Sequence, residues 1–231
     1  MRTIGLIGGM SWESSAVYYR LLNERTRLRL GGHHNARSLM YTVDFADIEH
    51  LQRAGDWGTM GDVLADAADR LTGAGAELVA LCTNTMHLVA DRITERVDVP
   101  FVHIVDATAD ALRADGVDTV GLLATRYTME HGFYAERMRE RGVTVVVPGD
   151  DDRTTVHDVI YEELTQGVVT DVSRDRYRGV IERLATAGAK GVILGCTEIG
   201  LLIGPDDASL PVYDSASIHV DAILDAARVE R

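Results

Sequence analysis

The sequence predicts an α/β protein with two similar Rossmann-like lobes, related by pseudo-twofold symmetry and with the active site in the cleft between them. Three observations support this fold class. Short apolar runs typical of buried parallel strands alternate with helical patterns. Blocks of the first half recur in the second half, in the same order. The two cysteines of the chain, Cys82 and Cys196, each follow such an apolar run and precede a threonine.

The internal repeat defines the expected lobes. The repeated blocks are residues 3–7 with 119–123, Tyr18 with Tyr134, residues 74–76 with 187–189, and residues 99–102 with 210–213. Because the blocks keep their order and nearly the same spacing, we interpret them as a duplication. We expect residues 1–98 and 212–231 to form an N-terminal lobe and residues 99–211 to form a C-terminal lobe.

The composition restricts the function classes. The 231 residues are 46% hydrophobic and 26% charged, as in soluble globular proteins, and the formal net charge is −13. This charge argues against nucleic acid and anionic membranes as partners. No apolar window is long enough to span a membrane, and residues 1–3 run straight into a strand, so we expect no signal peptide and a cytoplasmic location. Thiols stay reduced there, which favours catalytic cysteines over a disulfide.

The first lobe begins with a strand, a tight turn and a helix. The turn Gly8-Gly9-Met10-Ser11 is permissive, and Ser11 is expected to cap the helix. This turn lacks both the dinucleotide fingerprint and a Walker lysine, so we favour approach to a small anion over nucleotide binding. Val63 is expected on the buried face of its helix. The further elements expected here are a strand over residues 38–45 and helices over 61–71 and 86–97.

The second lobe repeats the arrangement from a strand over residues 118–124. The stretch from Gly149 to Asp152 is expected to be an acidic, solvated turn, and His33-His34 a solvated loop. The two histidines have no Cys or acidic partner at ligand spacing, and at the acidic turn we favour a solvated loop over metal binding, so we expect no metal site. The further elements expected here are helices over residues 129–141, 155–165, 175–187 and 217–228 and strands over 143–147 and 211–214.

Both cysteines are expected at the carboxyl ends of parallel strands, where open α/β sheets bind their ligands. Thr83, Asn84 and Thr85 follow the first cysteine at a predicted helix start, where they either hold a carboxylate or cap the helix. Helix N-termini lower cysteine pKa values, so we expect one thiolate near neutral pH. The chain has one lysine, Lys190, at the far end of the second cysteine strand, which argues against pyridoxal phosphate chemistry.

The two cysteine motifs, Cys82-Thr83-Asn84-Thr85 and Gly195-Cys196-Thr197-Glu198-Ile199, resemble those of the aspartate/glutamate racemase family. Residues 4–11, 43–45 and 52–57 are similar to that family as well. The resemblance implies cofactor-independent racemisation of a small amino acid or dicarboxylate, often by a homodimer. It implies Cys82 and Cys196 as the two acid/base groups. The residues that it implies at the substrate site are Met10, Gln52, Thr83, Asn84, Thr85, Thr125, Gln166 and Thr197.

One departure from the family pattern concerns the substrate side chain. Acid-specific aspartate racemases carry a lysine where the alignment places Gln166. A second basic residue of that family has its nearest counterpart in Arg53, beside Gln52. An uncharged pair argues against strict aspartate specificity and resembles the broad-specificity branch of amino-acid racemases.

The expected mechanism is a two-base proton transfer, in which one cysteine thiolate removes the α-proton and the other cysteine returns a proton to the opposite face. Four other functions stay open. Relatives with the same cleft isomerise maleate with a cysteine pair, decarboxylate malonates with one cysteine, or racemise hydantoins. The non-enzymatic alternative is a carboxylate-binding sensor, which would leave both thiols idle. A metal-binding or redox pair is disfavoured because neither cysteine has a spaced ligand set.

Overall fold

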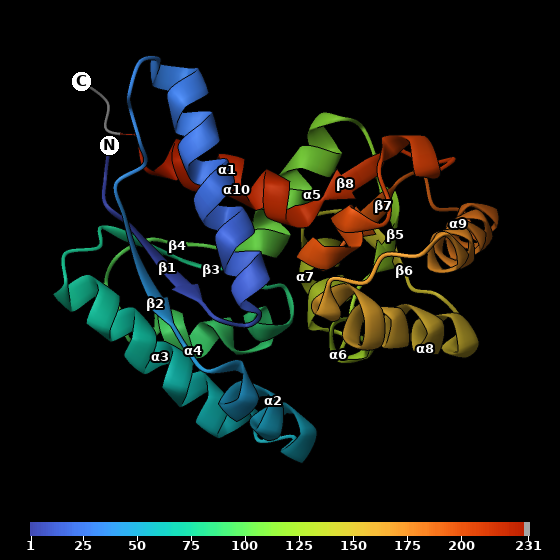
Figure 1. Ribbon diagram of the computed structural model, residues 1–231, viewed down its shortest axis with the longest axis horizontal. Coiled ribbons are helices and arrows are strands. Elements are labelled where there is room, and N and C mark those ends of the chain that lie inside the picture. Colours follow the sequence, from blue (N-terminus) through green and yellow to red (C-terminus); the bar gives the residue numbers. More distant parts are fainter. Residues whose placement is uncertain (229–231) are drawn as a thin grey trace. The chain divides into compact units, whose positions relative to one another are not determined.

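The computed structural model describes residues 1–228 and contains two compact α/β units (Figure 1). Unit 1 comprises residues 1–103 and the C-terminal segment from residue 219, and unit 2 comprises residues 104–218. Each unit contains a parallel four-stranded sheet with helices, so the predicted α/β class is confirmed. Of the expected first lobe, residues 229–231 lie outside the described part.

The sheet of unit 1 has the strand order β2-β1-β3-β4. All its pairings are parallel, and its strands are β1 (Ile4–Gly8), β2 (Ser38–Thr42), β3 (Leu78–Leu81) and β4 (Phe101–Val102). The strand β4 pairs with β3 and thus belongs to the first sheet. The expected boundary at residues 98/99 placed this strand in the second lobe, whereas the units change at residues 103/104.

Helices cover both faces of the first sheet. Two glycines of β1 show this, because side chains at their positions would point to opposite faces. A Cβ on Gly5 would lie 3.3 Å from Leu71 of α3 (Trp57–Gly73), while a Cβ on Gly8 would lie 2.5 Å from Ser15 of α1 (Trp12–Leu30). In Figure 1, α1 and α3 accordingly lie on opposite sides of the sheet. The helical segments of unit 1 before residue 103 are α1 (Trp12–Leu30), α2 (Phe45–Ala54), α3 (Trp57–Gly73), the 3₁₀ segment η1 (Thr85–Val89) and α4 (Ala90–Thr94).

The sheet of unit 2 has the equivalent strand order, β6-β5-β7-β8. Its strands are β5 (Thr119–Leu123), β6 (Thr144–Val146), β7 (Val192–Leu194) and β8 (Val212–Asp214), all paired in parallel. The expected boundary at residues 211/212 placed β8 in the first lobe, whereas its pairing with β7 makes it part of the second sheet.

The helical segments of unit 2 are shorter and more divided. They are α5 (Ile104–Ala114), α6 (Arg126–Glu130), α7 (Phe133–Glu140), α8 (Asp150–Asp158), the π segment η2 (Val159–Glu163), the 3₁₀ segment η3 (Leu164–Gln166), α9 (Asp171–Thr186) and the 3₁₀ segments η4 (Thr197–Leu201) and η5 (Pro205–Asp207). Helix α10 (Ser215–Ala226) begins in unit 2 and continues into unit 1.

The equivalent sheet orders agree with the duplication inferred from sequence. Tyr18 and Tyr134, which the repeat aligns, are both fully buried. Each lies on a helical segment after the first strand of its sheet and packs into the interior of its own unit. A buried tyrosine at this position of the repeat is therefore common to the cores of both units.

Several expected elements differ in the structure. The acidic residues Asp150 to Asp152 are the first turn of α8, where carboxylates interact favourably with the helix dipole, rather than a turn. The helix expected over 129–141 is interrupted at Gly132, whose φ of 76° is left-handed. Val63, expected to be buried, is 38% exposed. Among the described residues, no helix combines the length and apolarity needed to cross a bilayer.

Candidate active site

The first cysteine lies immediately after β3, at the carboxyl end of the sheet in unit 1. Its backbone N–H donates to the Ile7 carbonyl of β1 at 2.9 Å, and its side chain is fully buried. The chain then turns through Thr83 and Asn84 into η1. The expected α-helix over 86–97 is instead this 3₁₀ segment followed by the single turn of α4.

His87 fixes the backbone that follows Cys82. Its Nδ1 donates to the Thr83 carbonyl at 2.7 Å, because a carbonyl oxygen only accepts. The ring is 3% exposed and packs edge-on against His103, with ring centroids 4.5 Å apart. These contacts give His87 a structural role as support for the loop after the first cysteine.

The second cysteine lies at the corresponding end of the sheet in unit 2, one residue further beyond its strand than Cys82. Gly195 follows β7 and donates its N–H to the Leu123 carbonyl of β5 at 2.7 Å. A Cβ on Gly195 would lie 2.9 Å from that of Ala124, so only glycine allows β5 and β7 to approach in this way. Cys196 comes next and is half-buried. The predicted placement of both cysteines at strand carboxyl ends is therefore confirmed.

A buried carboxylate contacts the second cysteine. Oε2 of Glu198 lies 2.8 Å from Cys196 Sγ and 2.7 Å from Thr197 Oγ1, and both groups donate to it. Glu198 is 5% exposed. Sequence reasoning included Glu198 in the motif but not among the site residues. The signal that could have identified it was an acidic residue two positions after a cysteine at a buried strand end.

In each sheet, the loop after the first strand lies at the carboxyl ends of the strands, where the cysteine also lies. In unit 1, Ile7 of β1 pairs with Leu81 of β3, so the Met10 loop and Cys82 leave the sheet side by side. In unit 2, Leu123 of β5 pairs with Leu194 of β7, so the Thr125 loop and Cys196 lie at the same carboxyl end of the sheet.

Both loops are held by helix caps. Ser11 accepts from the Ser14 N–H at 3.3 Å, as predicted, and caps α1. Thr125 caps α6 by accepting from the Thr128 N–H at 3.4 Å. Met10, directly before its cap, is 6% exposed. Thr125, which the resemblance implies at the substrate site, is therefore a helix cap in the structure.

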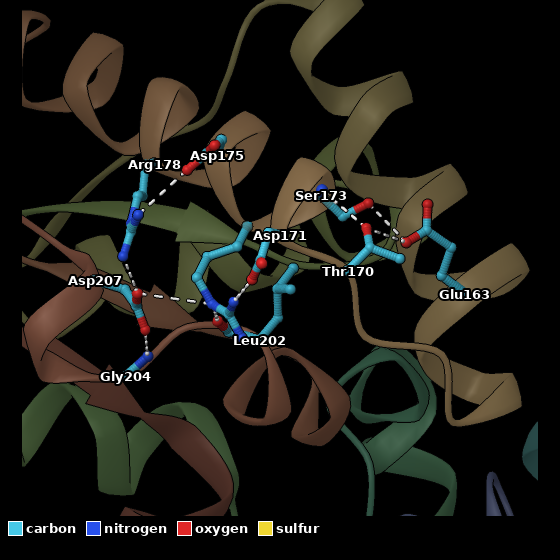
Figure 2. Close-up of polar contacts among 10 residues, drawn as sticks. Glu163, Thr170, Asp171, Ser173, Asp175, Arg178, Leu202, Gly204 and Asp207 are labelled. Carbon is cyan, nitrogen blue, oxygen red and sulfur yellow. Dashed lines mark hydrogen bonds and ion pairs between the residues drawn. The ribbon is translucent and has the colours of Figure 1, made fainter.

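The segment after Cys196 is anchored to α9 by a polar network (Figure 2). The Arg174 guanidinium donates to the Leu202 carbonyl at 3.0 Å, and Asp207 accepts from Arg178. Asp207 also accepts from the Gly204 N–H at 2.9 Å. These contacts fix the loop that carries η4 and η5 against a long helix of the same unit.

A second part of this network lies before Gln166. The Glu163 carboxylate accepts from Ser173 Oγ at 2.6 Å and from Thr170 Oγ1 at 3.4 Å (Figure 2). These bonds tie the end of η2 to the start of α9. Gln166 follows in η3 and is exposed.

Comparison with known proteins agrees with this arrangement. Residues 7–223 match the model of the Asp/Glu/Hydantoin racemase family. The chain belongs to the Asp/Glu/Hydantoin racemase family. A candidate Asp/Glu racemase from Yersinia pestis has a similar structure, with 50% identity and a TM-score of 0.93 over 98% of this chain and 99% of that one.

Two further members of this racemase family are informative. An aspartate racemase homologue from Pyrococcus horikoshii, PH1733, is 37% identical, with a TM-score of 0.87 over 98% of this chain and 99% of that one. The broad specificity amino-acid racemase RacX of Bacillus subtilis is 23% identical over 168 residues, or 73% of this chain and 72% of RacX. Racemases are isomerases, which is the enzyme class that the sequence predicted.

The ionisation of the two thiols in this racemase-family chain differs from the sequence-based expectation. Burial raises the pKa of the Cys82 thiol. Burial and the Glu198 carboxylate together raise the pKa of the Cys196 thiol well above its usual value. The expectation of lowered pKa values is therefore wrong. The helical segments after both cysteines are 3₁₀ turns of five residues. The N-terminus of so short a segment stabilises a thiolate only weakly and does not offset the loss of its hydration on burial.

Gln52 has a buried side-chain amide in the same unit as Cys82. It lies on α2 and is 3% exposed. Its Oε1 has no hydrogen-bond partner among the residues that the structure describes. A buried amide oxygen without a donor costs free energy, and a ligand with an N–H or O–H group would satisfy it.

Proposed function

We propose that this protein is an amino-acid racemase that needs no cofactor and transfers protons between Cys82 and Cys196. The observation that carries the proposal is the equivalent placement of the two cysteines. Each follows the third strand of a sheet with the same order. The N–H of Cys82 donates to the first strand of its sheet, and in unit 2 the N–H of Gly195, directly before Cys196, does the same. A pair of thiols placed in this way by a duplication suits a reaction with two equivalent proton positions.

In the proposed reaction, one cysteine thiolate removes the α-proton and the other cysteine thiol gives a proton to the opposite face. The scheme requires each sulfur to reach one face of the same α-carbon. The raised pKa values mean that a thiolate must be stabilised when substrate binds. The ammonium group of an amino acid supplies the required positive charge, because a nearby opposite charge favours the ionised thiol.

The developing negative charge on the substrate carboxylate needs preorganised donors. We propose that Thr83, Asn84 and Thr85 supply them beside Cys82, and Thr197 beside Cys196. Asn84 and Thr85 are 4% and 6% exposed, so their side chains are shielded from competing water. The other residues that we assign to the substrate site are Met10, Gln52, Thr125 and Gln166.

We further propose a broad specificity that includes neutral amino acids. Gln166 is uncharged at the position where the sequence resemblance implies a lysine for aspartate, and Gln52 stands beside Arg53, the nearest counterpart of the second basic residue. The buried Oε1 of Gln52 supports the same view, since an oxygen without a donor suits a hydroxyl or amide better than a carboxylate. The similarity to RacX, a broad specificity racemase, agrees with this proposal.

Proton NMR in D₂O tests the proposal directly. Purified protein is incubated with single L-amino acids without added cofactor, using aspartate, glutamate, homoserine and a neutral set in parallel. We expect loss of the α-proton signal together with formation of the D-enantiomer by chiral chromatography. The Cys82→Ser/Cys196→Ser double variant is the matched control. Absence of exchange with every amino acid would contradict the proposal, and maleate and arylmalonates would then test the isomerase and decarboxylase alternatives.

A further inference from the structure

The two cysteines differ in their surroundings, although the duplication places both at the carboxyl end of the third strand of a sheet. We propose that Glu198 holds Cys196 in its thiol form, so that in the free protein Cys196 is the proton donor of the pair and Cys82 is the member that becomes the thiolate. This inference rests on the proposed racemase function. Its principal test needs no turnover and therefore stands apart from the test of that function.

The geometry around Oε2 of Glu198 determines where the proton lies. In the 2.8 Å contact Cys196 Sγ donates and Glu198 Oε2 accepts, so the proton of this hydrogen bond belongs to the sulfur. The same oxygen accepts from Thr197 Oγ1 at 2.7 Å, which holds the carboxylate in place. Ionisation of Cys196 would place a negative charge on the sulfur 2.8 Å from the carboxylate oxygen. Repulsion between the two charges therefore favours the thiol form of Cys196.

No such group acts on Cys82. Burial alone raises its pKa, and among the described residues no charge contributes. The charged and titratable groups around Cys196 are Glu198 on η4, Tyr177 on α9, and Glu163 beyond Tyr177. The Tyr177 hydroxyl donates to the Val156 carbonyl at 2.8 Å, and Glu163 accepts from Ser173. Within the described part of unit 2, Glu198 is thus the carboxylate that contacts the sulfur.

The proton balance over one turnover follows from this asymmetry. The Cys82 thiolate takes the α-proton and becomes a thiol, while the S–H bond of Cys196 breaks and its proton bonds to the opposite face of the carbon. After product leaves, Cys196 is a thiolate that faces Glu198. Repulsion by the carboxylate drives uptake of a proton from water by Cys196, and Cys82 returns its proton to water.

Titration of single-cysteine variants tests the inference. Cys82→Ser leaves Cys196 as the one cysteine of the chain, and the ultraviolet absorbance of its thiolate is followed against pH. In Cys82→Ser/Glu198→Gln, which keeps the shape and removes the charge, we expect the midpoint to fall by about one pH unit or more. In Cys196→Ser, where Cys82 is titrated instead, adding Glu198→Gln should leave the midpoint unchanged.

The matched charge control is Glu182→Gln in the Cys82→Ser background. Glu182 is an exposed residue of α9, so its loss changes the net charge equally and should not move the midpoint. An unchanged or higher midpoint with Glu198→Gln would overturn the inference. Circular dichroism checks folding. If Glu198→Gln does not fold, Glu198→Asp withdraws the charge by one methylene, and its midpoint should also fall; an unchanged midpoint would overturn the inference as well.

Activity supplies a second readout. The two enantiomers have equal free energies, so kcat/KM is the same in both directions and its pH profile is the informative quantity. The basic limb reports ionisation of the remaining thiol. We expect Glu198→Gln to shift this limb to lower pH by about one unit and to leave the acidic limb in place. A uniform loss of activity with both limbs unmoved would indicate a merely structural role for Glu198 and would overturn the inference.

Discussion

The Tyr18 hydroxyl donates a hydrogen bond to Nδ1 of His219 at 2.9 Å, although 201 residues separate the two in sequence. Nε2 of the same ring lies 2.8 Å from the Val102 carbonyl, which only accepts. The ring proton is therefore on Nε2, and Nδ1 accepts from the tyrosine. A neutral, fully buried imidazole thus joins α10 to α1 and to β4 within unit 1.

This neutral histidine makes stability depend on pH. Burial lowers the pKa of His219 from 6.5 to about 4, so between these values the unfolded chain binds a proton that the folded chain does not. The free energy of unfolding therefore falls as the pH falls, by roughly 3 kcal/mol between about pH 7 and pH 4. Urea unfolding across this range measures the effect. His219→Gln should remove this component, and an equal slope in both proteins would contradict the prediction.

Loss of either thiol should abolish racemisation. Cys82→Ser and Cys196→Ser each remove one of the two proton-transfer groups, and we expect each to lower kcat by about a thousandfold or more. Exchange of the α-proton in D₂O and chiral chromatography measure the two halves of the reaction. The Glu182→Gln variant, altered on the exposed face of α9, should retain activity. Full racemisation by either single cysteine variant would exclude the two-base scheme.

Gly195→Ala should destabilise unit 2 and displace the second cysteine. The added Cβ would lie 2.9 Å from Ala124 Cβ and 3.2 Å from the Leu123 carbonyl oxygen, neither of which is the end of a flexible side chain. Overpacking of this kind costs about 1–3 kcal/mol. Gly149→Ala is the matched control, because its φ of −63° suits alanine and no atom lies within 4 Å of the new Cβ. Equal denaturation midpoints for the two variants would refute this explanation.

Asp207→Ala should loosen the segment after Cys196. The substitution removes the acceptor of the Gly204 N–H and the partner of Arg178. We expect faster hydrogen exchange at the Gly204 amide and in η4, with little change in the sheet. Asp175→Ala removes another carboxylate that contacts Arg178 without touching the loop, and it serves as the control. Unchanged exchange in Asp207→Ala would show that the network does not hold the loop.

Gln166→Lys should change substrate preference. Gln166 is exposed and takes the position where the sequence resemblance implies a lysine, so a cation there should attract a side-chain carboxylate. We expect the ratio of kcat/KM for aspartate to that for homoserine to rise about tenfold, equivalent to about 1.4 kcal/mol. Gln166→Met, which has similar length and no charge, should not raise the ratio. A similar rise with Met would mean that charge is not the cause.

Some features of the fold are readable from sequence because they depend on local patterns. Apolar runs ended by glycine or cysteine predicted the strands that precede Cys82 and Cys196, and the Ser11 cap was predicted from its residue type. The helix ends were less readable. Asp150 to Asp152 are polar enough for a turn, yet they begin α8, and the segment after Thr85 winds as a 3₁₀ turn. Polarity alone does not separate a solvated turn from a solvated first helical turn.

By itself, the sequence determined the α/β class, the duplication and the position of two cysteines at strand ends, because strand periodicity and repeated blocks can be recognised from the order of the residues alone. Only the tertiary structure decided which strands close each sheet. The backbone hydrogen bonds pair β4 with β3 and β8 with β7, whereas the boundaries expected from the repeat separated both pairs. Only the tertiary structure also decided how the thiols ionise. That property depends on burial and on the Glu198 carboxylate beside Cys196, and neither is fixed until the side chains pack.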